Sequence, residues 1–417
     1  MKIWRLALVL LFSLAFLGAL TLPAQEKQEK KEEPVIALIG GTLIDGTGAA
    51  PVSNATVLIQ GNKIKEAGPA ATVKIPKAAK KIDVTGKFIL PGFIDCHTHI
   101  STESDQLEYY TDTNSLGTLR AVQLMDKYLK SGVTAIRDVG SPIECLQAIL
   151  RASDLGYIDT IRLFACGCLI TVTGGHGDGM HGALGVDGPW AFRKAVREMF
   201  KAGFGHIKIS PTFTLEEAKA AVDEAKTLGV RITAHGGGFS DTIPTTMTRV
   251  AVQAGVQCIE HWNEMDDDVL DLMAQKGVYD VPTLTIYRVG YQTNDISKFL
   301  IEKRHWSQSM HETLFKKARE RKIVMAIGTD AGGKDRKLYP QIYFDEMKYF
   351  VELGSSPMEA IVAATRNGAL VLGKADELGT IEAGKLADIQ IVKGDPLKSL
   401  DVLGSPEIVI LNGKVHQ

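Results

Sequence analysis

The central part of the chain alternates short apolar runs with longer segments of helical periodicity. The longer segments place apolar residues three and four positions apart, which is typical of helices that pack on one face. Eight such β–α units over about 280 residues predict an α/β fold of the TIM-type (β/α)8 barrel class. The apolar runs predict strands at residues 88–95, 133–138, 160–165, 206–209, 230–234, 256–260, 278–281 and 323–327.

One predicted helix has clear signals at both ends. Thr214 and Glu217 have the spacing of a capping box, and Gly229 follows the last apolar residue, Leu228. A doubly wound open sheet would show the same alternation of strands and helices, but it carries a glycine-rich nucleotide loop after its first strand. No such loop follows residues 88–95, so the barrel is favoured.

The two ends of the folded region show strand patterns without helical periodicity. Short apolar runs separated by glycine-containing turns fill residues 35–89. The pattern returns in residues 373–417, where Asn412-Gly413 predicts a hairpin turn. Neither end is long enough to form a domain alone. We expect both to combine into one small β-sandwich domain beside a barrel domain of residues 90–372.

The first residues predict a segment outside the fold. Two basic residues precede an almost wholly apolar run, residues 6–22, and Ala24 offers a small residue for cleavage. We expect residues 1–24 to be a signal peptide removed on export, which would make the protein periplasmic or secreted. Polar residues 25–34 would form a disordered tether. An uncleaved membrane anchor is the alternative, because the apolar run falls only a little short of the ~20 residues that span a bilayer.

Composition and charge narrow the classes of function. The net charge of −2 provides no basic footprint, so a nucleic-acid partner has no electrostatic support. The five cysteines lack the spacing of a structural zinc site, and Cys166 and Cys168 are interpreted as small apolar residues near a strand end. We expect a small-molecule or dipeptide substrate and no membrane partner beyond the signal peptide. Assembly into a homo-oligomer is left open.

Histidine, lysine and aspartate residues recur where the predicted strands end. Side chains two positions apart on a strand point the same way, so the paired histidines of the first strand can reach one point. A TIM barrel builds its active site at the carboxyl ends of its strands, where all of these residues should meet. Each alone has an ordinary structural explanation, but six together predict a metal site. They are His97, His99, Lys208, His235, His261 and Asp330.

The motifs around these residues resemble those of the amidohydrolase superfamily. The likeness covers nearly everything after the predicted signal peptide. It is greatest for the imidazolonepropionase-like branch, which contains metal-dependent prolidases, other dipeptidases and N-acyl-amino-acid hydrolases. Residues 173–177, with His176 among glycines, also resemble a loop of that branch. The remaining motifs are Pro91-Gly92-Phe93-Ile94-Asp95-Cys96-His97-Thr98-His99, Ala234-His235, Glu260-His261, Gly328-Thr329-Asp330 and Gly379-Thr380-Ile381-Glu382-Ala383-Gly384-Lys385-Leu386-Ala387-Asp388.

The resemblance implies a binuclear metal-dependent enzyme that hydrolyses the amide bond of an Xaa-Pro-like dipeptide or an N-acyl amino acid. His97, His99 and Asp330 would bind the first divalent ion, and His235 with His261 the second. Zinc is the expected metal, since imidazole and carboxylate ligands suit it.

The resemblance also implies roles for three side chains. Lys208 would carry a CO2-derived carbamate that bridges both metals, because an ammonium group has three donors and no acceptor. Asp330 would be the catalytic base and acid, acting on a hydroxide shared by the metals. His176, on the loop after the third strand, would contact the substrate.

Several alternatives stay open at this stage. A mononuclear deaminase or cyclic-amide hydrolase is one, although such relatives generally lack the lysine at position 208. A lactonase or phosphotriesterase could use the same two-metal site, and a non-catalytic scaffold protein would be expected to lose ligands. The short loop of residues 210–213 differs from the longer one of prolidase-like relatives, which leaves specificity open. Arg288, after the seventh strand, could bind a substrate carboxylate.

Overall fold

The computed structural model describes residues 34–102, 113–236, 246–261, 265–293, 307–332 and 338–416. The predicted signal peptide and all but the last residue of the predicted tether lie outside these ranges. Within them, no helix combines the length and the apolar character needed to cross a membrane.

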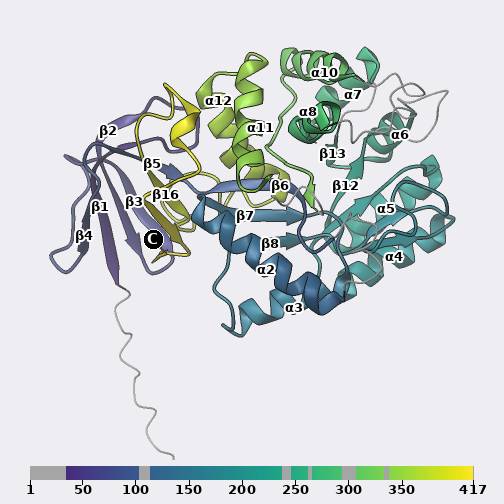
Figure 1. Cartoon of the computed structure of the whole chain (residues 1–417), viewed down its shortest axis with the longest axis horizontal. Coiled ribbons are helices and arrows are strands. Elements are labelled where there is room, and N and C mark those ends of the chain that lie inside the picture. The colour runs from purple at the N-terminus through teal and green to yellow at the C-terminus, as the bar shows by residue number, and fades with distance from the viewer. Residues whose placement is uncertain are drawn as a thin grey trace, which may run out of the picture. The chain divides into compact units, whose positions relative to one another are not determined.

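Strands from both ends of the folded region share one eight-stranded sheet, drawn in purple and yellow in Figure 1. The order is β18-β17-β16-β5-β1-β2-β3, with β4 beside β1. Strand β16 pairs antiparallel with β5, and β5 pairs parallel with β1. The strands are β1 (Val35–Leu43), β2 (Val52–Gln60), β3 (Lys63–Pro69), β4 (Lys80–Asp83), β5 (Lys87–Pro91), β16 (Ile389–Lys393), β17 (Ile408–Leu411) and β18 (Lys414–Val415).

Apolar packing joins the two ends of the chain within this terminal sheet. Leu38, Ile59 and Ile389 are fully buried in one cluster. The predicted hairpin turn is present, because Asn412 and Gly413 connect β17 to β18 with φ values of 53° and 75°. The two ends were expected to form a sandwich of facing sheets; their strands instead belong to a single hydrogen-bonded sheet.

The central region is α/β, and its strands pair in parallel. They form a sheet β15-β6-β7-β8 and a second sheet β10-β9-β11-β12-β13-β14. These strands are β6 (Phe93–His99), β7 (Val133–Asp138), β8 (Arg162–Ala165), β9 (Leu169–Thr171), β10 (Ala183–Gly185), β11 (His206–Ile209), β12 (Arg231–His235), β13 (Cys258–Glu260), β14 (Tyr279–Val281) and β15 (Ala331–Gly332).

Helices alternate with these strands and lie outside them in Figure 1. They are α2 (Asn114–Lys130), α3 (Ile143–Asp154), α4 (Pro189–Lys201), α5 (Leu215–Leu228), α6 (Thr246–Ala254), α7 (Asp267–Lys276), α8 (Leu284–Thr293), α10 (Gln308–Glu320), α11 (Gln341–Glu352), α12 (Pro357–Val362) and α13 (Gly368–Leu372).

The third strand of the expected barrel is broken in two. Strand β8 pairs with β7, whereas β9 pairs with β11, so this part of the chain passes from one sheet to the other. The break contains Gly167, whose φ is 73° and whose missing side chain leaves room for Phe204. All five cysteines are free; Cys166 is buried and Cys168 half-buried around the break. Both cysteines thus occupy the strand end where they were expected.

The eighth expected strand, residues 323–327, is not a regular strand. Its backbone nevertheless contacts strands on both sides. Asp280 N donates to Val324 O at 3.0 Å, and Cys96 N donates to Ile327 O at 2.9 Å. The segment therefore links β14 to β6. The order of strands is that of the expected barrel, but the ladder is interrupted here and at the third strand, so the two sheets do not join into one continuous ring.

Helix α5 begins and ends as its sequence predicts. Thr214 Oγ1 accepts from Glu217 N at 3.2 Å, and the Glu217 carboxylate accepts from Thr214 N at 2.7 Å. Gly229 ends the helix in the left-handed conformation, with φ at 70°. Ala218 and Ala225 are buried on its inner face, so the helix packs closely against the strands on either side of it.

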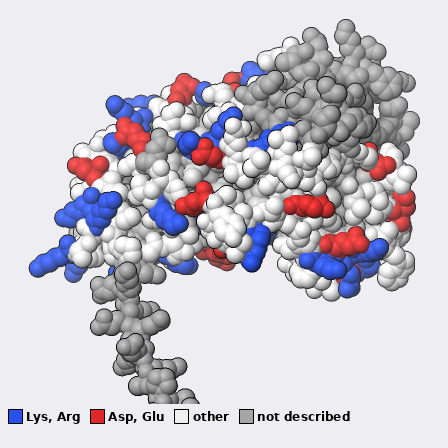
Figure 2. Space-filling model, turned by 60° about the horizontal axis from the view of Figure 1, so that its bottom comes forward, with Lys and Arg blue, Asp and Glu red and all other residues white. Residues whose placement is uncertain are grey.

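Charged side chains of both signs are scattered over the face seen in Figure 2. Ion pairs also connect neighbouring helices: Lys317 of α10 lies 2.9 Å from Asp267 of α7, and Arg321 lies 2.6 Å from Asp271. Exposed pairs of this kind contribute about 0–1 kcal/mol each to stability. The buried strands and the apolar cluster therefore hold the fold together.

Candidate metal centre

Five of the six predicted ligands form a tight group at the carboxyl ends of the parallel strands. Asp330 Oδ1 lies 3.2 Å from Nε2 of both His97 and His99. Asp330 Oδ2 lies 3.8 Å from His261 Nε2. The ring of His235 is centred 4.6 Å from the ring of His261. Residues from β6 and β12, the residue after β13 and the turn before β15 therefore meet at one point, with Asp330 at its centre.

In His97 and His99, the hydrogen bond made by Nδ1, the outer nitrogen, determines whether Nε2, the inner nitrogen that faces Asp330, carries a proton or a lone pair. His97 Nδ1 lies 2.7 Å from a carboxylate oxygen of Glu260, and His99 Nδ1 lies 2.8 Å from the carbonyl oxygen of Gly140. Both partners can only accept, so each Nδ1 carries the proton. In the neutral rings, Nε2 then presents a lone pair toward the oxygens of Asp330. Lone pairs that face one another across 3.2 Å repel unless a proton or a metal ion lies between them.

The other two histidines are held in the neutral form. Burial is the main cause that keeps the pKa of His261 and of His235 well below the ordinary value; at His261 the charge of Asp330 opposes this effect without outweighing it. His261 Nδ1 also lies 2.6 Å from Thr283 Oγ1. Neutral imidazole is the form that binds metals, so both rings suit this role.

Lys208 lies beside this group on β11. The strand register places it opposite Thr233, and the residue is only 2% exposed. Burial lowers the pKa of its amine, although the charges of Glu260 and Asp330 act in the opposite sense. A buried amine with a lowered pKa can react with CO2, which only the neutral form does.

Backbone conformation at the centre is unusual. His261, Thr283 and Asp330 have positive φ values of 68°, 48° and 53°, a region that non-glycine residues seldom occupy. Strained backbone of this kind persists where the surrounding structure enforces it, and it is concentrated at functional sites.

His176 lies beside His235, one of the predicted ligands. Its ring is centred 4.2 Å from the ring of His235 and is tilted by 30° from it. Its backbone N donates to Pro211 O at 2.6 Å, which ties the loop after β9 to the short loop after β11. The position suits a contact with a bound substrate.

Tyr287 and Arg288 lie in α8, which follows the seventh expected strand, and their side chains have different surroundings. The ring of Tyr287 is centred 6.0 Å from that of His261. Arg288 lies 2.7 Å from Glu352 and 4.4 Å from the centre of the Tyr349 ring. The guanidinium is therefore engaged with α11, and the expectation that it reaches a substrate carboxylate has no support in the structure.

Sequence analysis missed a layer of buried charge beneath the ligands. Arg137 Nη2 lies 2.5 Å from Glu260 Oε1, and Thr233 Oγ1 donates to the same oxygen. Burial alone would raise the pKa of Glu260, but Arg137 and the bond from His97 hold it well below the ordinary value. The available signal was a charged residue inside an otherwise apolar predicted strand, at positions 137 and 260.

Asp95 is a further residue to which sequence analysis assigned no role. Its carboxylate accepts from Thr329 Oγ1 and from Tyr128 Oη, each at 2.8 Å, and from His97 N at 3.1 Å. Burial raises the pKa of Asp95 to about 6, against these hydrogen bonds. The side chain joins the end of β6 to the residue before Asp330, and so connects two ligand-bearing segments.

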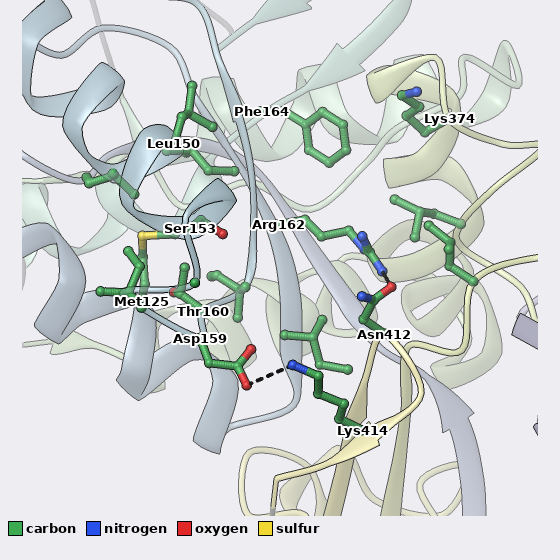
Figure 3. Close-up of a pocket in the computed structure, with 18 of the residues that line it drawn as sticks. Met125, Leu150, Ser153, Asp159, Thr160, Arg162, Phe164, Lys374, Asn412 and Lys414 are labelled. Atoms are coloured by element: carbon green, nitrogen blue, oxygen red, sulfur yellow. Dashed lines mark hydrogen bonds and ion pairs between the residues drawn. The ribbon is translucent and has the colours of Figure 1, made fainter. Parts of the chain in front are cut away.

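A separate pocket of about 530 Å³ lies at the other end of the strands. Figure 3 shows it between the start of β8 and the β17–β18 hairpin. Four of its charged residues form two pairs, because Asp159 lies 3.5 Å from Lys414 and Lys374 lies 2.8 Å from Glu377. Arg162 donates to the amide oxygen of Asn412 at 3.1 Å. None of the predicted ligands lines it, so it is not part of the metal centre.

Comparison with known proteins defines the class of this one. The model of the amidohydrolase family matches residues 88–416. The chain belongs to the amidohydrolase family.

Particular relatives narrow the class further. Ochratoxinase from Aspergillus niger is 27% identical over 91% of this chain and 85% of its own. Imidazolonepropionase from Caldanaerobacter subterraneus subsp. tengcongensis is 26% identical over 82% of this chain and 84% of its own. A Xaa-Pro dipeptidase, whose crystal structure contains bound methionine, has 30% sequence identity to this chain. The alignment covers 92% of this chain and 100% of the dipeptidase chain, with a TM-score of 0.82. The protein is a metal-dependent hydrolase of carbon–nitrogen bonds.

Proposed function

We propose that this protein is a binuclear amidohydrolase that cleaves the amide bond of a dipeptide of the Xaa-Pro kind or of an N-acyl amino acid. His97, His99 and Asp330 would hold one divalent ion, and His235 with His261 the other. The proposed metal is zinc. The central strands would act as a (β/α)8 barrel with this centre at their carboxyl ends.

One observation supports the metals most strongly. His97 Nε2 and His99 Nε2 each lie 3.2 Å from Asp330 Oδ1. Their outer nitrogens donate to acceptors, so the inner nitrogens have only lone pairs to offer while the rings are neutral. His97 Nε2 is buried and has no hydrogen-bond partner among the residues that the structure describes. His97, His261 and Asp330 also place their ligand atoms within 4.8 Å of one another. This donor set fits a divalent cation.

Lys208 supports a second metal. Its amine is buried beside the ligands and its pKa is lowered by burial. A carbamate on this amine would supply two oxygens and a negative charge, which two neighbouring cations require. The same reaction would remove the cost of a buried ammonium.

The side chains of the centre suggest the following chemistry. When bound, a divalent metal pair acidifies a water molecule and polarises the carbonyl of the scissile bond. Asp330 would accept the proton of the attacking water and return it to the leaving amine. The carboxylate oxygens of Asp330 lie 3.2 to 3.8 Å from the inner nitrogens of His97, His99 and His261, so an ionised Asp330 is placed among the ligands where it can accept a proton. His176 would contact the substrate.

A single-metal enzyme is the second candidate. Three of the ligands already surround one point, and one relative is an imidazolonepropionase. A mononuclear hydrolase would not need Lys208, which separates the two proposals.

Metal analysis combined with a substrate screen tests the proposal. The purified protein, loaded with zinc in bicarbonate buffer, should bind two ions per chain and hydrolyse members of a library of dipeptides and N-acyl amino acids. Lys208→Ala should bind fewer ions and lose most of its turnover. One ion per chain in both proteins, with turnover of cyclic amides, would favour the second candidate. Turnover of lactones or phosphotriesters alone would contradict the amide assignment.

A further inference from the structure

Beneath the predicted ligands, one buried carboxylate accepts hydrogen bonds from side chains of three other strands, which belong to both central sheets. Glu260 ends β13 and is 0% exposed. Its Oε2 accepts from His97 Nδ1 of β6 at 2.7 Å. Its Oε1 accepts from Arg137 Nη2 of β7 at 2.5 Å and from Thr233 Oγ1 of β12. Both oxygens are thus used, and one of the three donors is a predicted metal ligand.

Arg137 contacts the backbone of one ligand segment and the side chain of another. Its Nε donates to Cys96 O at 2.6 Å, directly before His97, while its Nη2 reaches Glu260, directly before His261. The rings of His97 and His261 are centred 4.4 Å apart. A single guanidinium therefore connects the strand ends that carry two of the ligands.

Stability alone does not explain this arrangement. Moving two charges out of water costs several kcal/mol per ion, and a buried pair seldom contributes more than an apolar pair of similar volume. Arg137 is 2% exposed, so solvent does little to offset that cost. A buried ion pair that offers so little stabilisation suggests another role.

We propose that Glu260 and Arg137 are positioning residues of the metal centre, an inference that rests on the proposed function. Glu260 holds His97 with the proton on Nδ1 and the lone pair of Nε2 directed at the metal. Arg137 holds the carboxylate of Glu260 in place through its hydrogen bond and fixes the two strand ends. The first metal then binds to ligands that are already in place, and neither residue contacts the metal or the substrate.

Glu260→Gln tests this directly, because an amide offers only one acceptor oxygen. If that oxygen accepts from Arg137, the amide NH2 faces His97 Nδ1, which must become an acceptor. The proton then moves to Nε2 and blocks the metal. If the amide is turned the other way, its NH2 faces the guanidinium, and donor meets donor. Either orientation weakens the site.

The experiment measures cobalt binding by the zinc-free, full-length protein against a chromophoric chelator, together with the visible spectrum of the cobalt form. Glu260→Gln should bind the tighter cobalt ion roughly 10–100-fold more weakly, with an altered spectrum. Glu224→Gln is the matched control, because Glu224 is also buried and lies 3.3 Å from Arg193 and 2.7 Å from Arg197 on the helical layer. It should bind cobalt as the wild type does.

The outcomes separate this inference from the proposed function. Wild-type affinity and spectrum in Glu260→Gln would overturn the positioning role while leaving the metal centre intact. A wild-type protein that binds no cobalt would overturn the proposed function itself. If Glu260→Gln does not fold, Arg137→Lys replaces it, since lysine keeps the charge but cannot contact Cys96 O and Glu260 with a rigid fork. Weaker cobalt binding is expected there too, and unchanged binding would contradict the role.

Discussion

At the scale of single residues, Asp330 organises the centre. Its two oxygens face the inner nitrogens of His97, His99 and His261 at 3.2 to 3.8 Å. The backbone of Asp330 is held at a φ of 53°, and its N donates to His97 O at 2.9 Å. The side chain is 25% exposed, so one edge is open to an incoming substrate. This position suits both a ligand and a proton carrier.

Asp330→Asn separates these two functions. Asparagine keeps an oxygen for the metal but cannot accept and return a proton. We expect the variant to retain most of its metal while kcat falls roughly 10²–10⁴-fold. Metal content is measured by mass spectrometry and kcat on the best substrate of the screen. Asp126→Asn, a change at an exposed carboxylate of α2, serves as control. Full activity in Asp330→Asn would remove this residue from the mechanism.

Metal affinity should depend on pH through His99. Burial would lower the pKa of His99, but the hydrogen bond and charge of Asp330 raise it above the ordinary value of 6.5 in the metal-free protein. Below that raised pKa a proton occupies the lone pair that the metal needs, and above it the lone pair is free. Affinity should therefore fall as the medium is acidified. Chelator competition between about pH 5 and 9 measures this, and a flat profile would contradict it.

At the scale of elements, the regular strands were predictable and the irregular ones were not. The strand at 206–209 and the one at 133–138 are present with the predicted bounds. The break at Gly167 was hidden, because the glycine lies between two cysteines that continue the apolar pattern. Residues 323–327 have the composition of a strand, but they form an isolated bridge between Met325 and Asp280 and single backbone hydrogen bonds in place of a regular ladder. Apolar patterns report burial, whereas pairing depends on neighbours that are distant in the sequence.

The same limit applies to the site. The candidate ligands stand at strand ends, and the prediction of a metal site was made from that position. Glu260 and Arg137 are separated by 123 positions, so nothing near either residue indicates its partner. The role of a buried charged residue can be inferred only when its oppositely charged partner is known, and the partner is found only in the three-dimensional structure.

The start of α5 provides a stability prediction. Thr214→Ala removes the hydroxyl that accepts from Glu217 N at 3.2 Å, and it should cost about 1 kcal/mol in the free energy of unfolding. Urea unfolding of the metal-loaded protein should show a lower midpoint with an unchanged slope, while kcat stays as in the wild type. Thr214→Ser keeps the cap and is the control. Equal stability of the two variants would show that the capping box contributes little.

At the scale of the whole molecule, strands from both ends of the folded region form one sheet beside the central α/β region. Strand β5 leads directly into β6, and Gly92 N donates to Asp388 O at 2.8 Å. The terminal sheet is therefore bonded to the segment that delivers His97 and His99. This connection explains why residues near the end of the chain belong to the same folded unit as the metal centre.

Export is a proposal that rests on residues 1–24 alone. Mature protein recovered from the source cells should begin at Gln25, as N-terminal sequencing would show. Recovery of chains that retain the apolar run in the membrane fraction would favour the anchor instead.

The most direct test of the account is a crystal structure of the zinc-loaded protein with an anomalous difference map at the zinc edge. The account predicts two peaks, one among His97, His99 and Asp330 and the other beside His235 and His261. Density for a carbamate should extend from Lys208 Nζ between them. A single peak with an unmodified lysine, or peaks outside this group, would contradict the two-metal centre.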